Sequence, residues 1–160
     1  MIVVWSLAGA AAGTLVLSTA LRLGSELKLT RMDLPFLVGT MVTEDRERAK
    51  LLGWGLHAAA GLGFGLVYAG VFAATGRSGW LFGAALGLLH GLVAGTAVVE
   101  TLLPFAHRRI GSATTASPGT PLLEPPGLLM LNYGRATPVV TALGHLAYGA
   151  LVGGLASFAS

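Results

Sequence analysis

Four long apolar stretches dominate the chain, and polar residues gather between them. The apolar stretches cover about residues 2–23, 51–75, 80–103 and 138–159, and the polar segments are 24–50, 104–137 and the short turn 76–79. A helix needs about 20 residues to cross the hydrocarbon core of a bilayer. The pattern therefore predicts one transmembrane domain over residues 1–160, an all-α polytopic membrane four-helix bundle.

Composition narrows the class of protein further. Hydrophobic residues make up 54% of the chain, charged residues only 11%, and the mean hydropathy is +0.75. A soluble domain carries about a quarter of its residues charged, so a soluble globular protein is excluded. The chain has no cysteine, which excludes disulfides, thiolate metal sites and covalently attached haem.

The basic residues lie almost entirely on one side of the predicted spans. Nine of the ten fall in or beside the two long connections: Arg22, Lys28, Arg31, Arg46, Arg48, Lys50, Arg108, Arg109 and Arg135. The tenth, Arg77, lies in the short turn. Because Lys and Arg are retained on the cytoplasmic side, we expect a multi-pass protein of the inner (cytoplasmic) membrane with cytoplasmic connections and both termini outside. These charges indicate phospholipid headgroups, and no nucleic acid, as partners.

A charged segment, residues 43–50, precedes the second span. Thr43 is a favourable N-cap, acidic residues follow it in the first turn, and basic residues come next. This order matches the partial positive charge at the N-terminus of a helix. We therefore expect the segment to extend the second span as a helix with one solvated face.

The two halves of the chain resemble each other. Residues 12–21 and 94–103 are identical at six of ten aligned positions, counted directly from the sequence. The pattern His57, Gly61, Gly65 recurs as His145, Gly149, Gly153. The repeat predicts two tandem helical hairpins related by a pseudo-two-fold axis along the membrane normal, with His57 and His145 at the same depth.

Glycines recur at four-residue spacing in every predicted span. They are Gly9 and Gly13, Gly61 and Gly65, Gly83, Gly87, Gly91 and Gly95, and Gly149 and Gly153. Lipid provides no hydrophobic driving force between helices, so small residues at contacts must allow close packing. These glycines predict glycine-zipper packing faces rather than a site of chemistry.

Both long connections contain apolar segments. They include Met32, Asp33, Leu34, Pro35 and Phe36 in the first connection, and Leu128, Leu129 and Met130 in the second. Such segments lie on the membrane surface, fold back into it, or dock on a partner. Docking on another subunit, or packing onto the protein itself, best explains long apolar connections in a chain with one minimal turn.

Four ionisable side chains fall inside the predicted spans: His57, His90, Glu100 and His145. Such residues are costly in a bilayer and are functional candidates. Ten helical residues place His90 about 15 Å from Glu100, so these two predict separate sites.

Several roles stay open for the other three. If their faces converge, Glu100, His57 and His145 form a divalent metal site or a proton relay. His57 and His145 alone would suit axial ligation of a b-type haem. A structural role, in which each histidine donates to a carbonyl or hydroxyl of a neighbouring helix, is favoured, and contact with a lipid or quinone headgroup is the remaining alternative.

No motif for catalysis is present. The chain lacks HExxH, a glycine-rich phosphate loop and a convincing Ser/His/Asp arrangement. The sequence predicts no enzyme, no catalytic residue and no committed metal or cofactor, with haem b and a divalent metal kept as alternatives.

The run from Arg31 to Met41, followed by Gly53, His57, Gly61, Gly65 and Tyr68, resembles a family of small four-helix prokaryotic integral membrane proteins of unknown function. In that family a Met-Asp-Leu-Pro segment follows the first span and His-x3-Gly-x3-Gly lies in the second. The resemblance covers the first half of the chain well and the second half loosely. It implies an integral membrane protein with four spans, and it supplies no activity.

The expected function is that of a non-catalytic accessory subunit of a larger membrane complex, of an energy-transducing or electron-transfer kind, with other membrane subunits as partners. Glycine-faced helices, apolar connections and few chemically capable groups favour it. One alternative is a small homo-oligomeric ion, proton or metal transporter that uses Glu100 and the histidines. Another is a b-type haem carrier ligated by His57 and His145.

Overall fold

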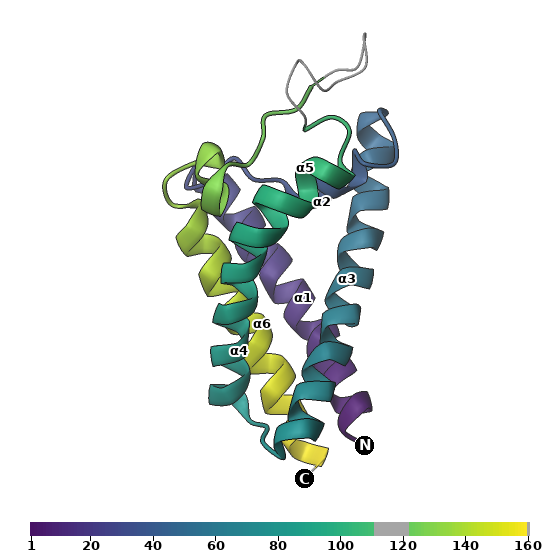
Figure 1. Ribbon diagram of the computed structural model, residues 1–160, viewed down its shortest axis with the longest axis vertical. Coiled ribbons are helices and arrows are strands. Elements are labelled where there is room, and N and C mark those ends of the chain that lie inside the picture. Colours follow the sequence, from purple (N-terminus) through teal and green to yellow (C-terminus); the bar gives the residue numbers. More distant parts are fainter. Residues whose placement is uncertain (111–121, 160) are drawn as a thin grey trace.

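Four long helical rods form the molecule, as the computed structural model shows for residues 1–110 and 122–159 (Figure 1). The elements are α1 (Ile2–Glu26), α2 (Leu34–Gly39), α3 (Arg46–Thr75), α4 (Trp80–Val93), the π-helix η1 (Ala94–Leu102), α5 (Leu103–Ala106), the 3-10 helix η2 (Leu128–Tyr133), α6 (Thr137–Ala156) and the 3-10 turn η3 (Ser157–Ala159). Helices α1 and α3, the continuous rod from α4 to α5, and α6 with η3 are each long and apolar enough to cross a membrane. The prediction of an all-α four-helix membrane protein is confirmed.

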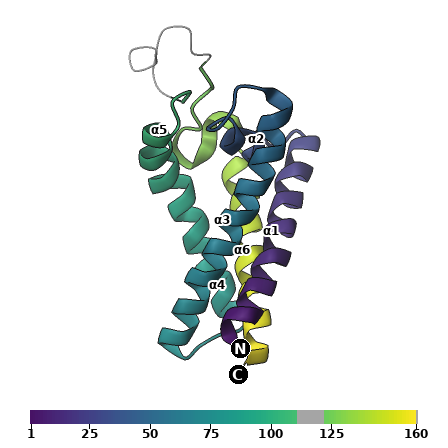
Figure 2. The same cartoon turned by 90° about the vertical axis from the view of Figure 1, so that its right-hand side faces the viewer.

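Both termini lie at one end of the bundle and both long connections lie at the other (Figures 1 and 2). We call these the turn end, which also holds residues 76–79, and the loop end. The connections are shorter than predicted, because α1 continues to Glu26, α3 begins at Arg46 and α5 ends at Ala106.

The charged segment before the second span is helical from Arg46 onward, and its N-cap is Asp45 rather than Thr43. Asp45 Oδ1 accepts a hydrogen bond from the Arg48 backbone N–H at 2.8 Å. Thr43 Oγ1 instead accepts from the Asp45 N–H at 3.3 Å. A carboxylate is favoured over a hydroxyl here because its negative charge also interacts favourably with the partial positive charge at the N-terminus of the helix.

The third span departs from regular α-helix over η1, which the apolar pattern did not predict. The Thr96 hydroxyl donates to the Leu92 carbonyl at 2.7 Å. Such a bond competes with the backbone ladder and loosens it. It lies where the helix changes from α to π geometry, a form typical of functional or strained helix segments.

Helices α4 and α6 touch backbone to backbone. A Cβ atom added at Gly83 would overlap the carbonyl oxygen of Gly149, and one added at Gly87 would overlap that of His145. A Cβ at Gly153 would likewise overlap the Gly79 carbonyl. Dispersion contacts between backbones at this distance are the main attraction available to helices in lipid.

Helix α6 packs equally closely on α1. A Cβ at Gly9 would lie 2.6 Å from Val152 Cα, and one at Gly13 would lie 2.8 Å from Tyr148 Cδ2. The Tyr148 hydroxyl then reaches past α1 and donates to the Gly61 carbonyl of α3 at 2.6 Å. Helix α6 is therefore the central element, in contact with all three other rods.

The remaining predicted packing glycines accept neighbours in the same way. A Cβ at Gly61 would overlap the Thr14 side chain, and one at Gly65 would lie 2.5 Å from Ala10 Cβ, so α1 and α3 meet there. Gly91 leaves room for the His145 side chain, whose Cβ would be 3.0 Å away, and Gly95 for Met130, whose Cε would be 3.3 Å away.

The packing lacks the two-fold symmetry that the repeat predicted. A two-fold axis would make the α3–α4 contact equivalent to the close α6–α1 contact. Instead α3 and α4 meet through large rings, with the Phe64 and His90 centroids 3.9 Å apart and those of Phe72 and Phe82 6.0 Å apart. Aromatic side chains hold the backbones of α3 and α4 apart, whereas glycines let those of α6 and α1 touch. The expectation that the two hairpins pack in equivalent ways is therefore wrong.

The two connections fold onto the protein and onto each other. Arg31 forms a bidentate ion pair with Glu124, in which Nη1 and Nη2 donate to Oε2 and Oε1 at 2.9 and 3.1 Å. Tyr133 donates its hydroxyl to the Glu124 carbonyl at 2.8 Å, and burial raises the pKa of Tyr133 to about 12, so this donor stays protonated. Beneath them, the Thr30 and Thr137 hydroxyls are hydrogen-bonded at 2.7 Å.

Most of the apolar connection residues predicted to dock on a partner are used in this packing. Met32 and Met130 are only 4% and 3% exposed, and Pro35 is buried. Leu34, Phe36 and Leu129 are partly covered, whereas Asp33 and Leu128 are exposed. Of the two accounts left open by the sequence, packing onto the protein itself describes the buried members.

His107 bridges the two long connections. It is buried, and the sequence did not single it out. Its Nδ1 accepts from the Arg109 N–H at 3.2 Å, which leaves the proton on Nε2. Nε2 donates this proton toward the Leu37 carbonyl oxygen and the Thr40 hydroxyl oxygen, each 3.0 Å from the nitrogen. Neutral His107 therefore ties the end of α5 to the C-terminus of α2.

The α4–α6 contact generates a first prediction. Gly87→Ala should lower the free energy of unfolding by about 1–3 kcal/mol, because its Cβ must push the His145 carbonyl away. Gly63→Ala is the control, since a Cβ there meets nothing within 4 Å, and it should leave stability unchanged. Thermal unfolding in detergent measures both, and equal stability of the two variants would contradict the packing described.

His107 generates a second prediction. Burial lowers the pKa of His107 in the folded protein, so on acidification through about 6.5 the unfolded state takes up a proton that the folded state resists. Stability should fall as the pH drops from 7.5 to 5.5, by up to about 1.4 kcal/mol per pH unit from this group. His107→Gln keeps an N–H donor without titrating and should show a smaller pH dependence in thermal unfolding. The same pH dependence of thermal unfolding in the wild type and in His107→Gln would refute this role of His107.

Candidate functional site

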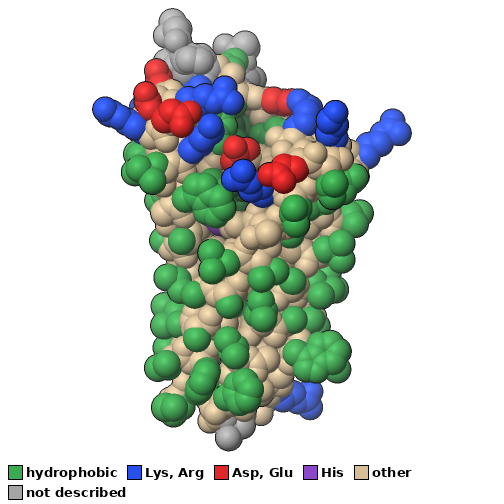
Figure 3. All heavy atoms as spheres, turned by 180° about the vertical axis from the view of Figure 1, so that it is seen from behind, with side chains coloured by type: hydrophobic (Ala, Val, Ile, Leu, Met, Phe, Trp, Pro, Cys, Tyr) green, Lys and Arg blue, Asp and Glu red, His purple; other side chains and the backbone are tan. Residues whose placement is uncertain are grey.

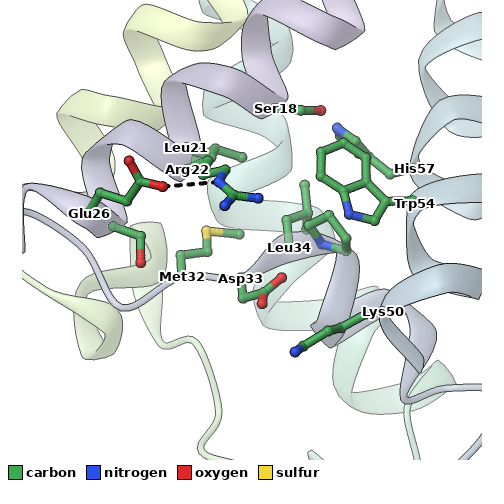
Figure 4. A pocket seen from close by; sticks show the side chains of 12 residues that line it. Ser18, Leu21, Arg22, Glu26, Met32, Asp33, Leu34, Lys50, Trp54 and His57 are labelled. Atoms are coloured by element: carbon green, nitrogen blue, oxygen red, sulfur yellow. Dashed lines mark hydrogen bonds and ion pairs between the residues drawn. The ribbon is translucent and has the colours of Figure 1, made fainter. Parts of the chain in front are cut away.

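A cavity of about 340 Å³ opens between α1, α2 and α3 at the loop end (Figure 4). It is lined by Ser18, Leu21, Arg22, Ser25 and Glu26 from α1, by Met32 and Asp33 just before α2 and Leu34 and Pro35 in its first turn, and by Lys50, Trp54 and His57 from α3. Three elements separated in sequence thus build one site.

Close packing at either side of the cavity explains why it is there. Helices α1 and α3 meet at Gly61 and Gly65 and then diverge toward the loop end (Figure 1). Helix α2 closes the widening space because it lies directly on α3. A Cβ at Gly53 would overlap the Pro35 carbonyl, and one at Gly39 would overlap that of Ala49.

The outer part of the cavity is charged and balanced in sign. Arg22 and Lys50 are its cations, and Glu26 and Asp33 are its anions. Arg22 Nε pairs with Glu26 at 3.0 Å, and both side chains are largely exposed. Figure 4 shows the Arg22 guanidinium projecting into the cavity and Asp33 and Lys50 along one side of it.

The inner part holds two buried polar atoms without partners. Ser18 and His57 are 5% and 8% exposed, and neither Ser18 Oγ nor His57 Nε2 has a hydrogen-bond partner among the described residues. Figure 4 shows the two side chains pointing toward each other at the inner end. A buried polar group left unsatisfied costs about 1–3 kcal/mol. Ser6, Tyr68 and Thr141 also have buried polar atoms without a partner among the described residues, and Ser18 and His57 differ from them in lining the cavity.

A second hollow of about 320 Å³ lies on the outer side of the same helices. It shares Ser18, Arg22, Glu26 and Trp54 with the cavity and adds Leu15, Thr19 and Leu23. Leu15 and Leu23 are 67% and 51% exposed, on a helix apolar enough to span the membrane. The polar cavity therefore continues sideways into an apolar groove.

The predicted intramembrane residues do not form one site. His90 packs on His145, with ring centroids 4.8 Å apart and the rings nearly perpendicular. His145 Nδ1–H donates to the Thr141 carbonyl at 2.9 Å, one turn earlier in α6 itself, so the acceptor is on the same helix and not on a neighbouring one as predicted. His57 instead faces the cavity (Figure 4).

Glu100 stands apart from the histidines. Its side chain is exposed on η1, whereas His57 and His145 are buried. Within the described part of the chain, no group of three or more His, Cys, Asp or Glu side chains is arranged to hold a metal ion. The sequence left open whether Glu100 converges with His57 and His145, and the structure does not bring the three together, because Glu100 is exposed on η1.

Sequence reasoning found His57 but did not predict the cavity that the structure forms around it. Ser18, Arg22 and Trp54 were assigned to spans or their ends, and no spacing rule joins them to Asp33. The usable signal was the pair Arg22 and Glu26, four residues apart, at the end of an otherwise apolar helix.

No protein-family model, curated protein or solved structure that was compared with this chain matches it. The resemblance carried by residues 31–68 therefore stays a prediction, and the function must be argued from the site.

Proposed function

We propose that this protein is a non-catalytic membrane protein that binds an amphiphile of the bilayer. The polar head occupies the cavity between α1, α2 and α3, and the apolar tail follows the groove past Trp54, Leu15 and Leu23. The observation that supports this most directly is the buried, unpartnered pair Ser18 Oγ and His57 Nε2 at the inner end of a charged cavity.

The location of the site supports a ligand that comes from the membrane. Basic and acidic side chains gather at the loop end, and hydrophobic side chains cover the rods below it (Figure 3). The cavity lies at this boundary, where the headgroups of a leaflet would be. Because nine of the ten basic residues lie at this end, we propose that it faces the cytoplasm and that the ligand comes from the cytoplasmic leaflet of the inner membrane.

A second candidate, an accessory subunit of a larger complex, is favoured by one face of α3. Added Cβ atoms at Gly55 and Gly63 would meet nothing within 4 Å, and Ala59 between them is exposed. A face of small residues at four-residue spacing suits close approach of a helix from another subunit. The transporter alternative loses its main support, because Glu100 does not join the histidines.

Amphiphile binding predicts that added phospholipid stabilises the delipidated protein. A ligand at 100 times its dissociation constant adds about 2.7 kcal/mol to stability. Trp54→Ala, which removes the wall shared by cavity and groove, should lose at least half of the lipid-induced rise in unfolding temperature. Trp80→Ala is the matched control, because this exposed tryptophan lies at the turn end. The proposal is refuted if lipid stabilises neither the wild type nor the control, or stabilises all three proteins equally.

The subunit candidate makes a separate prediction that exploits the absence of cysteine from the chain. Gly63→Cys, alkylated with a maleimide that carries a benzophenone, should on illumination crosslink to a second polypeptide in native membranes by insertion into one of its C–H bonds. Leu81→Cys, on an exposed position of α4 and treated in the same way, should not. Gel separation and mass spectrometry of the crosslinked band identify the partner. Equal labelling of both cysteines by lipid-soluble reagents without any crosslink would contradict a helix partner on α3.

A further inference from the structure

We propose that the ligand is a zwitterionic phospholipid with a primary ammonium in its headgroup, a phosphoethanolamine lipid. This inference rests on the proposed function and names the chemistry of the same site. It is drawn from the arrangement of charges and of unused hydrogen-bonding atoms around the cavity.

The sign balance of the cavity selects a headgroup that carries both charges. Two cations and two anions line it, and Arg22 already pairs with Glu26. An anionic headgroup would meet two carboxylates as well as the cations, and like charges at short range repel. A zwitterion can instead place its phosphate toward Arg22 and Lys50 and its ammonium toward Asp33, so that every charge has an opposite neighbour.

Asp33 has one carboxylate oxygen that is free to accept a hydrogen bond from a ligand. Its Oδ1 accepts from the Phe36 N–H at 3.0 Å and caps α2. Its Oδ2 has no hydrogen-bond partner within the described residues, and Asp33 lines the cavity. A primary ammonium brings three N–H donors, so it can bond to this oxygen without disturbing the cap.

The same oxygen discriminates ethanolamine from choline. A trimethylammonium group has no N–H donor and is recognised by a cage of aromatic faces. Among the described residues that line the cavity, Trp54 is the one Phe, Tyr or Trp, which is too few for a cage. The lining therefore favours the primary amine.

The order of polar groups along the cavity matches the order of groups in a phospholipid. Lys50 and Asp33 lie at the outer part, and Arg22 offers a planar fork of donors that suits phosphate. His57 lies seven residues, about 10 Å, further along α3 than Lys50, beside Ser18. These two buried groups are placed to hydrogen-bond the glycerol ester region, below which the groove of Leu15 and Leu23 receives an acyl chain.

Native mass spectrometry with equimolar ethanolamine, choline and glycerol phospholipids of identical acyl chains tests this inference. In the wild type, the ethanolamine lipid should exceed the choline lipid in bound adducts by about tenfold, the effect of one charge-assisted hydrogen bond. Asp33→Asn should bring the two lipids to near parity while a lipid still binds, because asparagine keeps the N-cap. Asp45→Asn, a change in the N-cap of α3 outside the cavity, should retain the preference.

The other outcomes overturn the inference in distinguishable ways. Equal occupancy by all three lipids, or a preference for the glycerol or choline lipid, would overturn the headgroup assignment and leave amphiphile binding intact. Displacement of lipid by soluble glycerophosphoethanolamine at equal concentration would show that the source of the headgroup is a soluble molecule. Absence of any adduct sensitive to Trp54→Ala would overturn the proposed function as well.

Discussion

Contact between glycine-lined backbones is the constraint on which this structure depends. In lipid, helices gain nothing from burying apolar surface, so they associate where their backbones can approach closely. Helix α6 does this on two sides, with α4 through Gly83, Gly87, Gly149 and Gly153, and with α1 through Gly9 and Gly13. The positions of α3 and of both connections follow from this central three-helix unit.

The cavity results from the place where this close packing stops. Rings of Phe64 and Phe72 hold α3 away from α4, and α3 touches α1 only as far as Gly61 and Gly65 before the two diverge. The space is closed by α2, which itself lies on α3 through Gly39 and Gly53. A polar, charged hollow at a membrane boundary is thus a geometric consequence of unequal helix contacts, and its chemistry depends on which side chains border it.

The loop end is ordered by polar contacts that replace those of water. Arg31 with Glu124, Thr30 with Thr137, and His107 with Leu37 and Thr40 join segments about 70 to 107 residues apart in sequence. Buried polar groups are costly unless paired, so this network specifies one arrangement of the connections. Ser18 and His57 are buried without such pairing among the described residues and line the cavity, which is the observation behind the proposed ligand.

Sequence alone determined the four spans, the helical extension before residue 51 and the gathering of charge at one end, because these depend on local hydropathy and helix-start chemistry. It did not determine helix rotation, so it left open whether Glu100 meets His57 and His145. The structure packs His90 on His145 and leaves Glu100 exposed. Residues such as His107, Ser18 and Trp54 acquire their roles from elements distant in sequence. Only tertiary packing decides which faces meet, since near-uniform glycine, alanine and leucine surfaces leave many rotations equally apolar and steric fit selects among them.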